Sequence, residues 1–223
     1  MTTAEDAPVE YRYYRTALIV AVFATAMGYL EAAVVIYLRG LYYPEGFTFP
    51  LRLMEQRVLL VELGREAATL VMLAALACLS GRKLADRLAF FMLAFAVWDI
   101  FYYIWLKLLI GWPESWFTWD ILFLIPLPWI GPVLSPLVVS LAMLSGAWFI
   151  LRRLRGGGQF RPVPREWFFA LSGAGLIFIS YVIDTDAGLR GGMPAPYRWE
   201  LLAGGLALGY YALFRCLRRT CHV

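Results

Sequence analysis

Residues 87–110 read RLAFFMLAFAVWDIFYYIWLKLLI, and only Arg87, Asp99 and Lys107 among them are charged. A helix rises 1.5 Å per residue, so this stretch would extend about 36 Å and cross a hydrocarbon core about 30 Å thick. The stretch therefore predicts a transmembrane helix. Asp99 falls near its middle, where an ionised group is costly and usually serves a function.

Apolar runs of similar length occur on both sides of this one. The chain has 223 residues, of which 61% are hydrophobic and 16% charged, whereas soluble domains are about 45 to 50% apolar. We therefore predict an all-α fold, a polytopic membrane helix bundle that forms a single integral membrane domain over residues 1–223. Its six predicted transmembrane helices cover about 16–38, 58–80, 87–110, 131–151, 167–184 and 198–215.

The distribution of Lys and Arg predicts the orientation of this bundle. If the chain has six spans, 13 of its 20 basic residues fall on the side of the two termini. An excess of basic residues marks the cytoplasmic side, so both termini are predicted to be cytoplasmic. Arg outnumbers Lys by 18 to 2, as in proteins of GC-rich prokaryotes. We predict a multi-pass protein of a prokaryotic cytoplasmic (inner) membrane.

The lipid bilayer is accordingly one predicted partner. Because topology explains the formal net charge of +4, no nucleic-acid partner is expected. The basic loop at residues 152–165 is interpreted first as a topology signal, and the alternative is that it binds anionic lipid or a protein partner.

Residues 112–136 contain four Trp and five Pro in an otherwise apolar sequence. Each Pro removes a backbone donor and obstructs the preceding turn, so this segment cannot be a regular helix. We predict a Pro/Trp-rich segment that is either interfacial, as part of an aromatic belt, or re-entrant. Irregular backbone persists at membrane depth only against protein or a wet cavity, so a re-entrant form would help to wall a site.

Apart from Arg87 at the inner end of the third, the charged side chains of the first three predicted spans fall in their outer halves, together with Tyr102 and Tyr103. At about 1.5 Å per residue their depths overlap, which predicts one shared polar site for a ligand. The alternative is that these groups pair with one another only to hold the helices together. The predicted ligand-binding residues are Glu31, Glu62, Arg65, Glu66, Asp99, Tyr102, Tyr103 and Lys107.

The residue types in this set limit its chemistry. The single histidine is His222, near the end of the chain, which argues against haem ligation, His-rich metal sites and a Ser–His nucleophile. Carboxylates suit hard divalent cations, so a divalent cation is the one cofactor considered. If a metal binds, its predicted ligands are Glu31, Glu62, Glu66 and Asp99.

The leading hypothesis is an inner-membrane protein whose outward-facing polar cavity binds a small solute or cation, as a transporter or as the substrate-binding subunit of one. One alternative is an enzyme that uses a divalent cation to act on a lipid or isoprenoid substrate, which leaves open whether the chain is an enzyme. A third is a structural or assembly subunit of a membrane complex, suggested by a small-residue helix face that other membrane subunits could contact. That face comprises Ala17, Ala21, Ala24 and Gly28.

Overall fold

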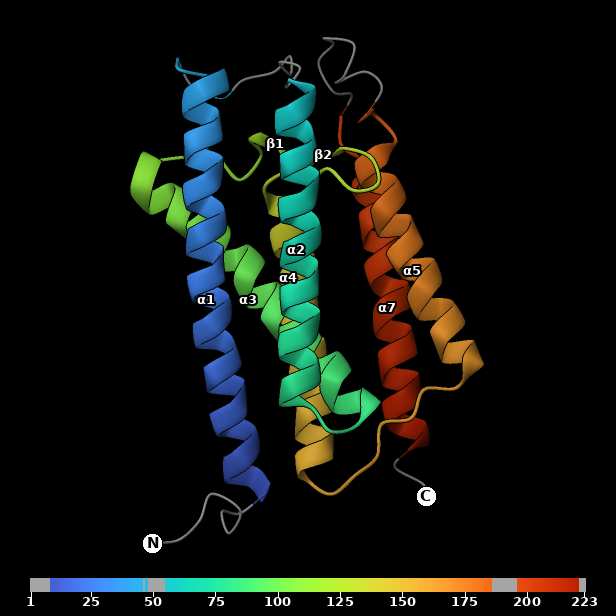
Figure 1. Cartoon of the computed structure of the whole chain (residues 1–223). Helices are drawn as coiled ribbons and strands as arrows, with labels where there is room; N and C mark the ends of the chain where they lie inside the picture. The colour runs from blue at the N-terminus through green and yellow to red at the C-terminus, as the bar shows by residue number, and fades with distance from the viewer. Residues whose placement is uncertain (1–8, 46, 48–54, 186–195, 221–223) are drawn as a thin grey trace, which may run out of the picture.

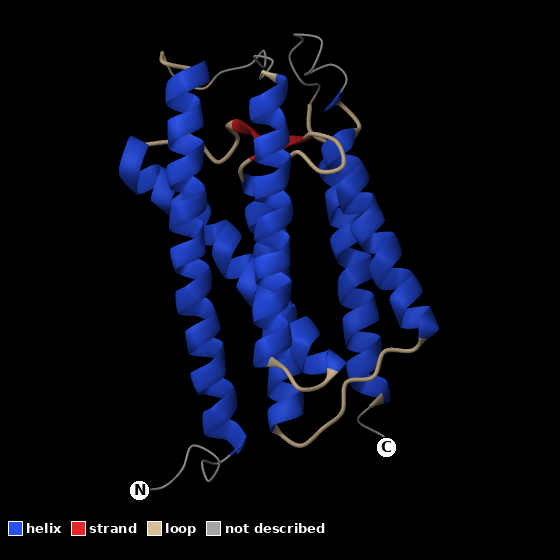
Figure 2. Cartoon of the chain, in the orientation of Figure 1, coloured by secondary structure: helices blue, strands red, loops and turns tan. Residues whose placement is uncertain are grey.

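The computed structural model describes residues 9–45, 47, 55–185 and 196–220, and His222 lies outside these ranges. The protein is mostly helical, at 76%, with six helices among the described residues (Figures 1 and 2). These helices are α1 (Val9–Tyr42), α2 (Gln56–Ser80), α3 (Leu84–Ile110), α4 (Leu134–Arg155), α5 (Pro164–Val182) and α7 (Trp199–Arg219).

Each of the six predicted runs coincides with one helix, although most helices extend a few residues beyond the apolar stretch. Four of them, α1, α3, α4 and α7, are long and apolar enough to cross a membrane. The outer half of α2 carries four charged residues, and α5 begins with Arg165 and Glu166. Four candidate spans are therefore established, and the six-span topology stays a prediction.

The helices form one elongated bundle in which α3 crosses the others obliquely (Figure 1). α1 begins and α7 ends at the same end of this bundle. The basic residues predict that this end is cytoplasmic, and we call it the inner end. The opposite end, where α1 ends at Tyr42 and α2 begins at Gln56, is called the outer end.

Small residues allow two pairs of helices to approach closely. A Cβ atom on Gly28 of α1 would lie 2.9 Å from the backbone oxygen of Trp98 in α3. A Cβ atom on Gly173 of α5 would likewise lie 2.5 Å from the oxygen of Gly205 in α7. Ala24 is fully buried in the core that α1 shares with α3. Gly28 and Ala24 of this small-residue face thus pack within the chain, and the role of an assembly subunit stays a prediction.

Residues 112–136 contain a β-hairpin, so the prediction of an all-α fold was incomplete. α3 ends at Ile110, and the following Gly111 has a φ of 70°, the left-handed conformation that glycine favours at a helix C-terminus. The antiparallel strands β1 (Trp119–Phe123) and β2 (Trp129–Pro132) then pair with each other. This pairing satisfies backbone groups in a segment whose prolines forbid a helix.

The hairpin lies among the helices near the outer end, behind α2 in Figure 2, where its strands are red. It contacts both sides of the bundle. The Trp129 ring stacks on Tyr181 of α5 with centroids 5.7 Å apart, and the N–H of Leu124 reaches a side chain of α2. Whether the segment re-enters the membrane or lies at its interface stays a prediction.

Candidate functional site

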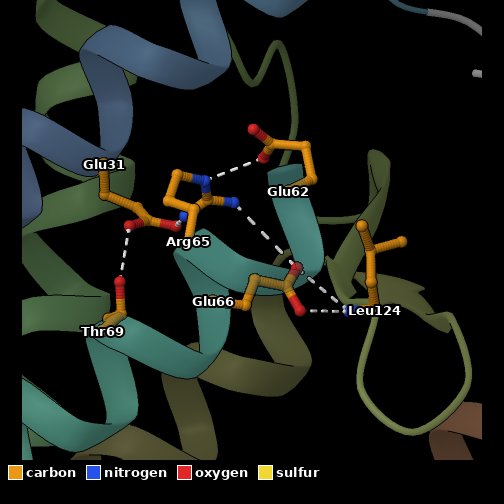
Figure 3. Close-up of polar contacts among 6 residues, drawn as sticks. All are labelled: Glu31, Glu62, Arg65, Glu66, Thr69 and Leu124. Atoms are coloured by element: carbon orange, nitrogen blue, oxygen red, sulfur yellow. Dashed lines mark hydrogen bonds and ion pairs between the residues drawn. The ribbon is translucent and has the colours of Figure 1, made fainter. Parts of the chain in front are cut away.

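Arg65 of α2 joins carboxylates from two helices (Figure 3). Its guanidinium forms an ion pair with Glu31 of α1, and its Nε lies 2.8 Å from Oε2 of Glu62, one turn earlier on α2. Thr69 Oγ1 donates a hydrogen bond to the other carboxylate oxygen of Glu31 at 3.3 Å. Side chains of α2 thus bind α1 through both oxygens of a single carboxylate.

A third carboxylate, Glu66, faces the hairpin rather than α1. The backbone N–H of Leu124 donates to both of its oxygens, with distances of 2.9 and 3.1 Å. Arg65 Nη2 lies 4.0 Å from Glu66, at the limit of an ion pair. Glu31, Glu62, Arg65 and Glu66, which we call the acidic cluster, therefore connect α1, α2 and the hairpin (Figure 3).

The sequence of α2 explains why the cluster forms there. Its buried residues are Glu62, Glu66, Thr69, Leu73 and Ala77, which recur every three or four positions and so share one face. The outer part of this face is polar and the inner part is apolar. The inner part packs into the core with α1 and α3, whereas the cluster attaches the outer part.

The acidic cluster contains three carboxylates and one guanidinium, all of them largely shielded from solvent. Glu62 and Glu66 are each only 4% exposed, and the side chains of Arg65 and Glu31 are 19% and 12% exposed. Three ionised carboxylates beside one guanidinium would leave two negative charges without a partner charge. A buried charge is stable only beside an opposite charge, so the acidic cluster could accept a further positive charge.

A second ion pair lies nearer the outer end. Arg39 Nη2 of α1 lies 2.9 Å from Oδ1 of Asp120 in β1, and Tyr103 Oη donates to Oδ2 at 3.3 Å. The Arg39 guanidinium also stacks over Trp112, 3.7 Å from the ring centroid. Asp120 is only 2% exposed, and this burial raises its pKa to about 6 although Arg39 opposes the shift.

Sequence reasoning did not select Arg39 or Thr69, and it considered Asp120 only as a further residue that could close the ring of charges at the outer level. The available signal for Arg39 was its place eight residues after Glu31 near the end of the same helix. Asp120 was recognisable only as an acid in an apolar, Pro-rich segment, because nothing in the sequence indicated that this segment folds back toward α1.

The predicted stripe on α3 does not join the acidic cluster. Asp99 accepts a hydrogen bond from Ser140 Oγ of α4 at 2.8 Å. Lys107 donates to the carbonyl oxygens of Gly111 and Pro113 at 2.9 and 2.7 Å, as basic side chains in a last turn commonly do. Four of the eight predicted residues are therefore in direct contact, and the stripe on α3 has other partners.

The two tyrosines of the predicted set lie beside the second ion pair. Tyr103 is buried and bonds to Asp120, and the ring of Tyr102 packs on Tyr103 with centroids 4.8 Å apart. That they contact a ligand stays a prediction.

The described part of the chain contains no group of three or more His, Cys, Asp or Glu side chains placed to hold a metal ion. In the acidic cluster the guanidinium of Arg65 lies between Glu31 and Glu62, so these two carboxylates already share a positive partner. Asp99, the fourth metal ligand considered, bonds to α4 instead. The four carboxylates considered as metal ligands are therefore not gathered around one position, and binding of a divalent cation stays a prediction.

Comparison of the chain with protein-family models, curated proteins and solved structures finds no match. The four apolar helices are compatible with a membrane protein. Any function must therefore be inferred from the geometry of the clusters themselves.

Proposed function

We propose that this chain is a six-span protein of a prokaryotic cytoplasmic membrane, with both termini in the cytoplasm, and that its acidic cluster binds a small monovalent or organic cation from the outer side. It would act as a transporter or as the substrate-binding subunit of one. The observation that carries this proposal is the excess of three shielded carboxylates over one arginine.

Glu66 is the residue best suited to contact the cation. Arg65 pairs closely with Glu31 and Glu62, whereas its nearest approach to Glu66 is 4.0 Å. The Leu124 N–H stabilises the Glu66 carboxylate but carries no full charge. A cation beside Glu66 would supply the missing charge, and such charge-assisted contacts are about twice as strong as neutral hydrogen bonds.

The way α2 is attached suggests how a ligand could enter. The outer half of the buried face of α2 is polar and is held in place by the acidic cluster. If a ligand replaced one of the contacts within the cluster, this half would loosen while the apolar inner half stays packed. A single helix that yields at one end is a common element of binding and gating transitions.

Thermal unfolding of the purified protein in detergent tests the proposal. The panel is methylammonium, choline, putrescine, Na⁺ and K⁺, compared at equal ionic strength. We expect saturable stabilisation by at least one member, because a ligand bound only to the folded state at 100 times its Kd adds about 2.7 kcal/mol. In Glu66→Gln we expect the midpoint concentration to rise roughly tenfold or more, the effect of losing one charged hydrogen bond.

Glu55→Gln is the matched control, because it removes one exposed carboxylate from the outer end of the same helix. It should respond as the wild type does. If no cation of the panel stabilises the wild type, or if Glu66→Gln responds equally, the cluster serves only to hold α1 and α2 together and the proposal is wrong.

A further inference from the structure

A cavity of about 530 Å³ opens between α1 and α4 at the inner end of the bundle, with Leu93 of α3 among its walls. Most of its lining is apolar, including Ala17, Leu141 and Leu144. Tyr14 and Trp148, which also line it, are 57% and 51% exposed, so the cavity is open along the side of the bundle. Its volume is within the range of about 300 to 1,000 Å³ that is usual for ligand pockets.

Two arginines stand at the inner end of this cavity. Arg155 of α4 stacks on Tyr14 of α1, 4.6 Å from its ring centroid, and Arg152 stacks on Trp148 at 5.1 Å. Both guanidinium groups are thus held against aromatic rings at this end of the cavity. No acidic side chain is among the described residues that line the cavity.

The depth of the cavity matches one leaflet of a bilayer. Leu141 and Arg152 are eleven residues apart on α4, which is about 16 Å along a helix. This is about half of a hydrocarbon core 30 Å thick. The apolar walls thus extend through the depth of the acyl chains, and the arginines lie at the level of the headgroups.

We propose that this cavity is a binding site for one anionic phospholipid of the inner leaflet, whose acyl chain lies against α1, α3 and α4 and whose phosphate contacts Arg152 and Arg155. Basic pockets between transmembrane helices on the cytoplasmic side bind such headgroups. A second cavity of about 350 Å³ on the opposite flank of α4 shares Arg152 and adds Arg153 and Arg218, which extends the positive surface for the headgroup. This inference rests on the proposed orientation, with the inner end of the bundle in the cytoplasm, and not on the acidic cluster, which is at the other end of the bundle.

Native mass spectrometry of the purified protein tests this with two lipids that share acyl chains, dioleoyl-phosphatidylglycerol and dioleoyl-phosphatidylcholine. We expect the wild type to retain phosphatidylglycerol preferentially. The variant Arg152→Gln/Arg155→Gln should lose that preference roughly 20-fold, as expected for two arginines near the membrane surface. Ala17→Phe, which places a ring inside the cavity, should lower retention of both lipids.

Arg161→Gln/Arg165→Gln is the matched control, because it removes two exposed arginines of the inner end, one in the loop after α4 and one in the first turn of α5, that do not line the cavity. It should behave as the wild type. Arg152→Lys/Arg155→Lys should keep most of the preference, which separates charge from misfolding. Equal retention of both lipids by the wild type, an unchanged preference in the double Gln variant, or displacement of the lipid by millimolar inorganic phosphate would overturn the proposal.

Discussion

Two arginines organise the polar interior of this protein, and each binds carboxylates from another element. Arg65 connects α2 to Glu31 of α1, and Arg39 connects α1 to Asp120 of the hairpin. Breaking such a buried pair by removing one partner typically costs about 3 to 5 kcal/mol, because the other charge is left behind. Both pairs lie near the outer end, whereas at the inner end Arg219 of α7 pairs with the buried Glu166 of α5.

The titration of Asp120 predicts that the free energy of unfolding depends on pH. Burial raises its pKa to about 6 against the opposing effect of Arg39. An acid whose pKa is higher in the folded than in the unfolded protein stabilises the fold at low pH, and this contribution disappears as pH rises through 6. Between pH 4 and pH 6.5 we expect the free energy of unfolding to fall by at most about 3 kcal/mol on this account.

Thermal or denaturant unfolding of the wild type and of Asp120→Asn across this pH range measures the effect. The pH profile of the variant should be flatter, because the group that titrates with a raised pKa has been removed. Glu200→Gln, an exposed acid at the outer end of α7, should keep the wild-type slope. Parallel profiles for the wild type and Asp120→Asn would contradict the assignment.

Among the elements, α2 differs most from an ordinary transmembrane helix, because one face is polar at its outer half and apolar at its inner half. Removal of Arg65 should therefore loosen the helix unevenly. In Arg65→Gln we expect amide hydrogen exchange of residues 58–66 to accelerate roughly tenfold or more, since several kcal/mol of buried pairing are lost there. Exchange of residues 73–80 should change little.

Arg57→Gln removes an exposed arginine from the outer end of the same helix and serves as the control for charge. Its exchange pattern should match that of the wild type. Uniform acceleration along the whole of α2 in Arg65→Gln would show that the helix is held as one unit and that the cluster is not its outer attachment.

The sequence predicted which residues of the site lie on each helix, but not how the helices are rotated against one another. Six helices were predicted because long apolar runs identify them, and the i, i+3 and i, i+4 spacing placed Glu62, Arg65 and Glu66 together. Spacing does not fix how a helix is rotated against its neighbours. That rotation turns Asp99 of α3 toward Ser140 of α4. Of the predicted carboxylates on α1 and α3, only Glu31 contacts α2.

The hairpin was beyond sequence reasoning for a related reason. Prolines predicted the absence of a helix, but no Asn-Gly or Asp-Gly turn signal marked the hairpin that pairs Asp120 with Gly131. The partners of Asp120 and Glu66 therefore became known only from the structure.

At the scale of the whole molecule, the two polar features lie at opposite ends. The acidic cluster, near the outer end, is proposed to bind a cation, and the arginine-lined cavity at the inner end is proposed to bind a lipid. Between them lies the apolar core that α1, α2 and α3 share around Leu73, Phe90 and Trp98. Such a separation suits a protein that exposes one site to each side of a membrane.

The central claim is that the acidic cluster takes up a cation from outside, and covalent labelling tests it most directly. Dicyclohexylcarbodiimide reacts with carboxyl groups in apolar surroundings, and peptide mass spectrometry can locate the adduct. Sealed, right-side-out vesicles would be treated with and without the stabilising cation in the outer solution, using Glu66→Gln as the control. We expect an adduct on Glu66 that the cation suppresses in a saturable way. Labelling of Glu66 that the cation leaves unchanged, or no labelling in the cluster at all, would contradict the account.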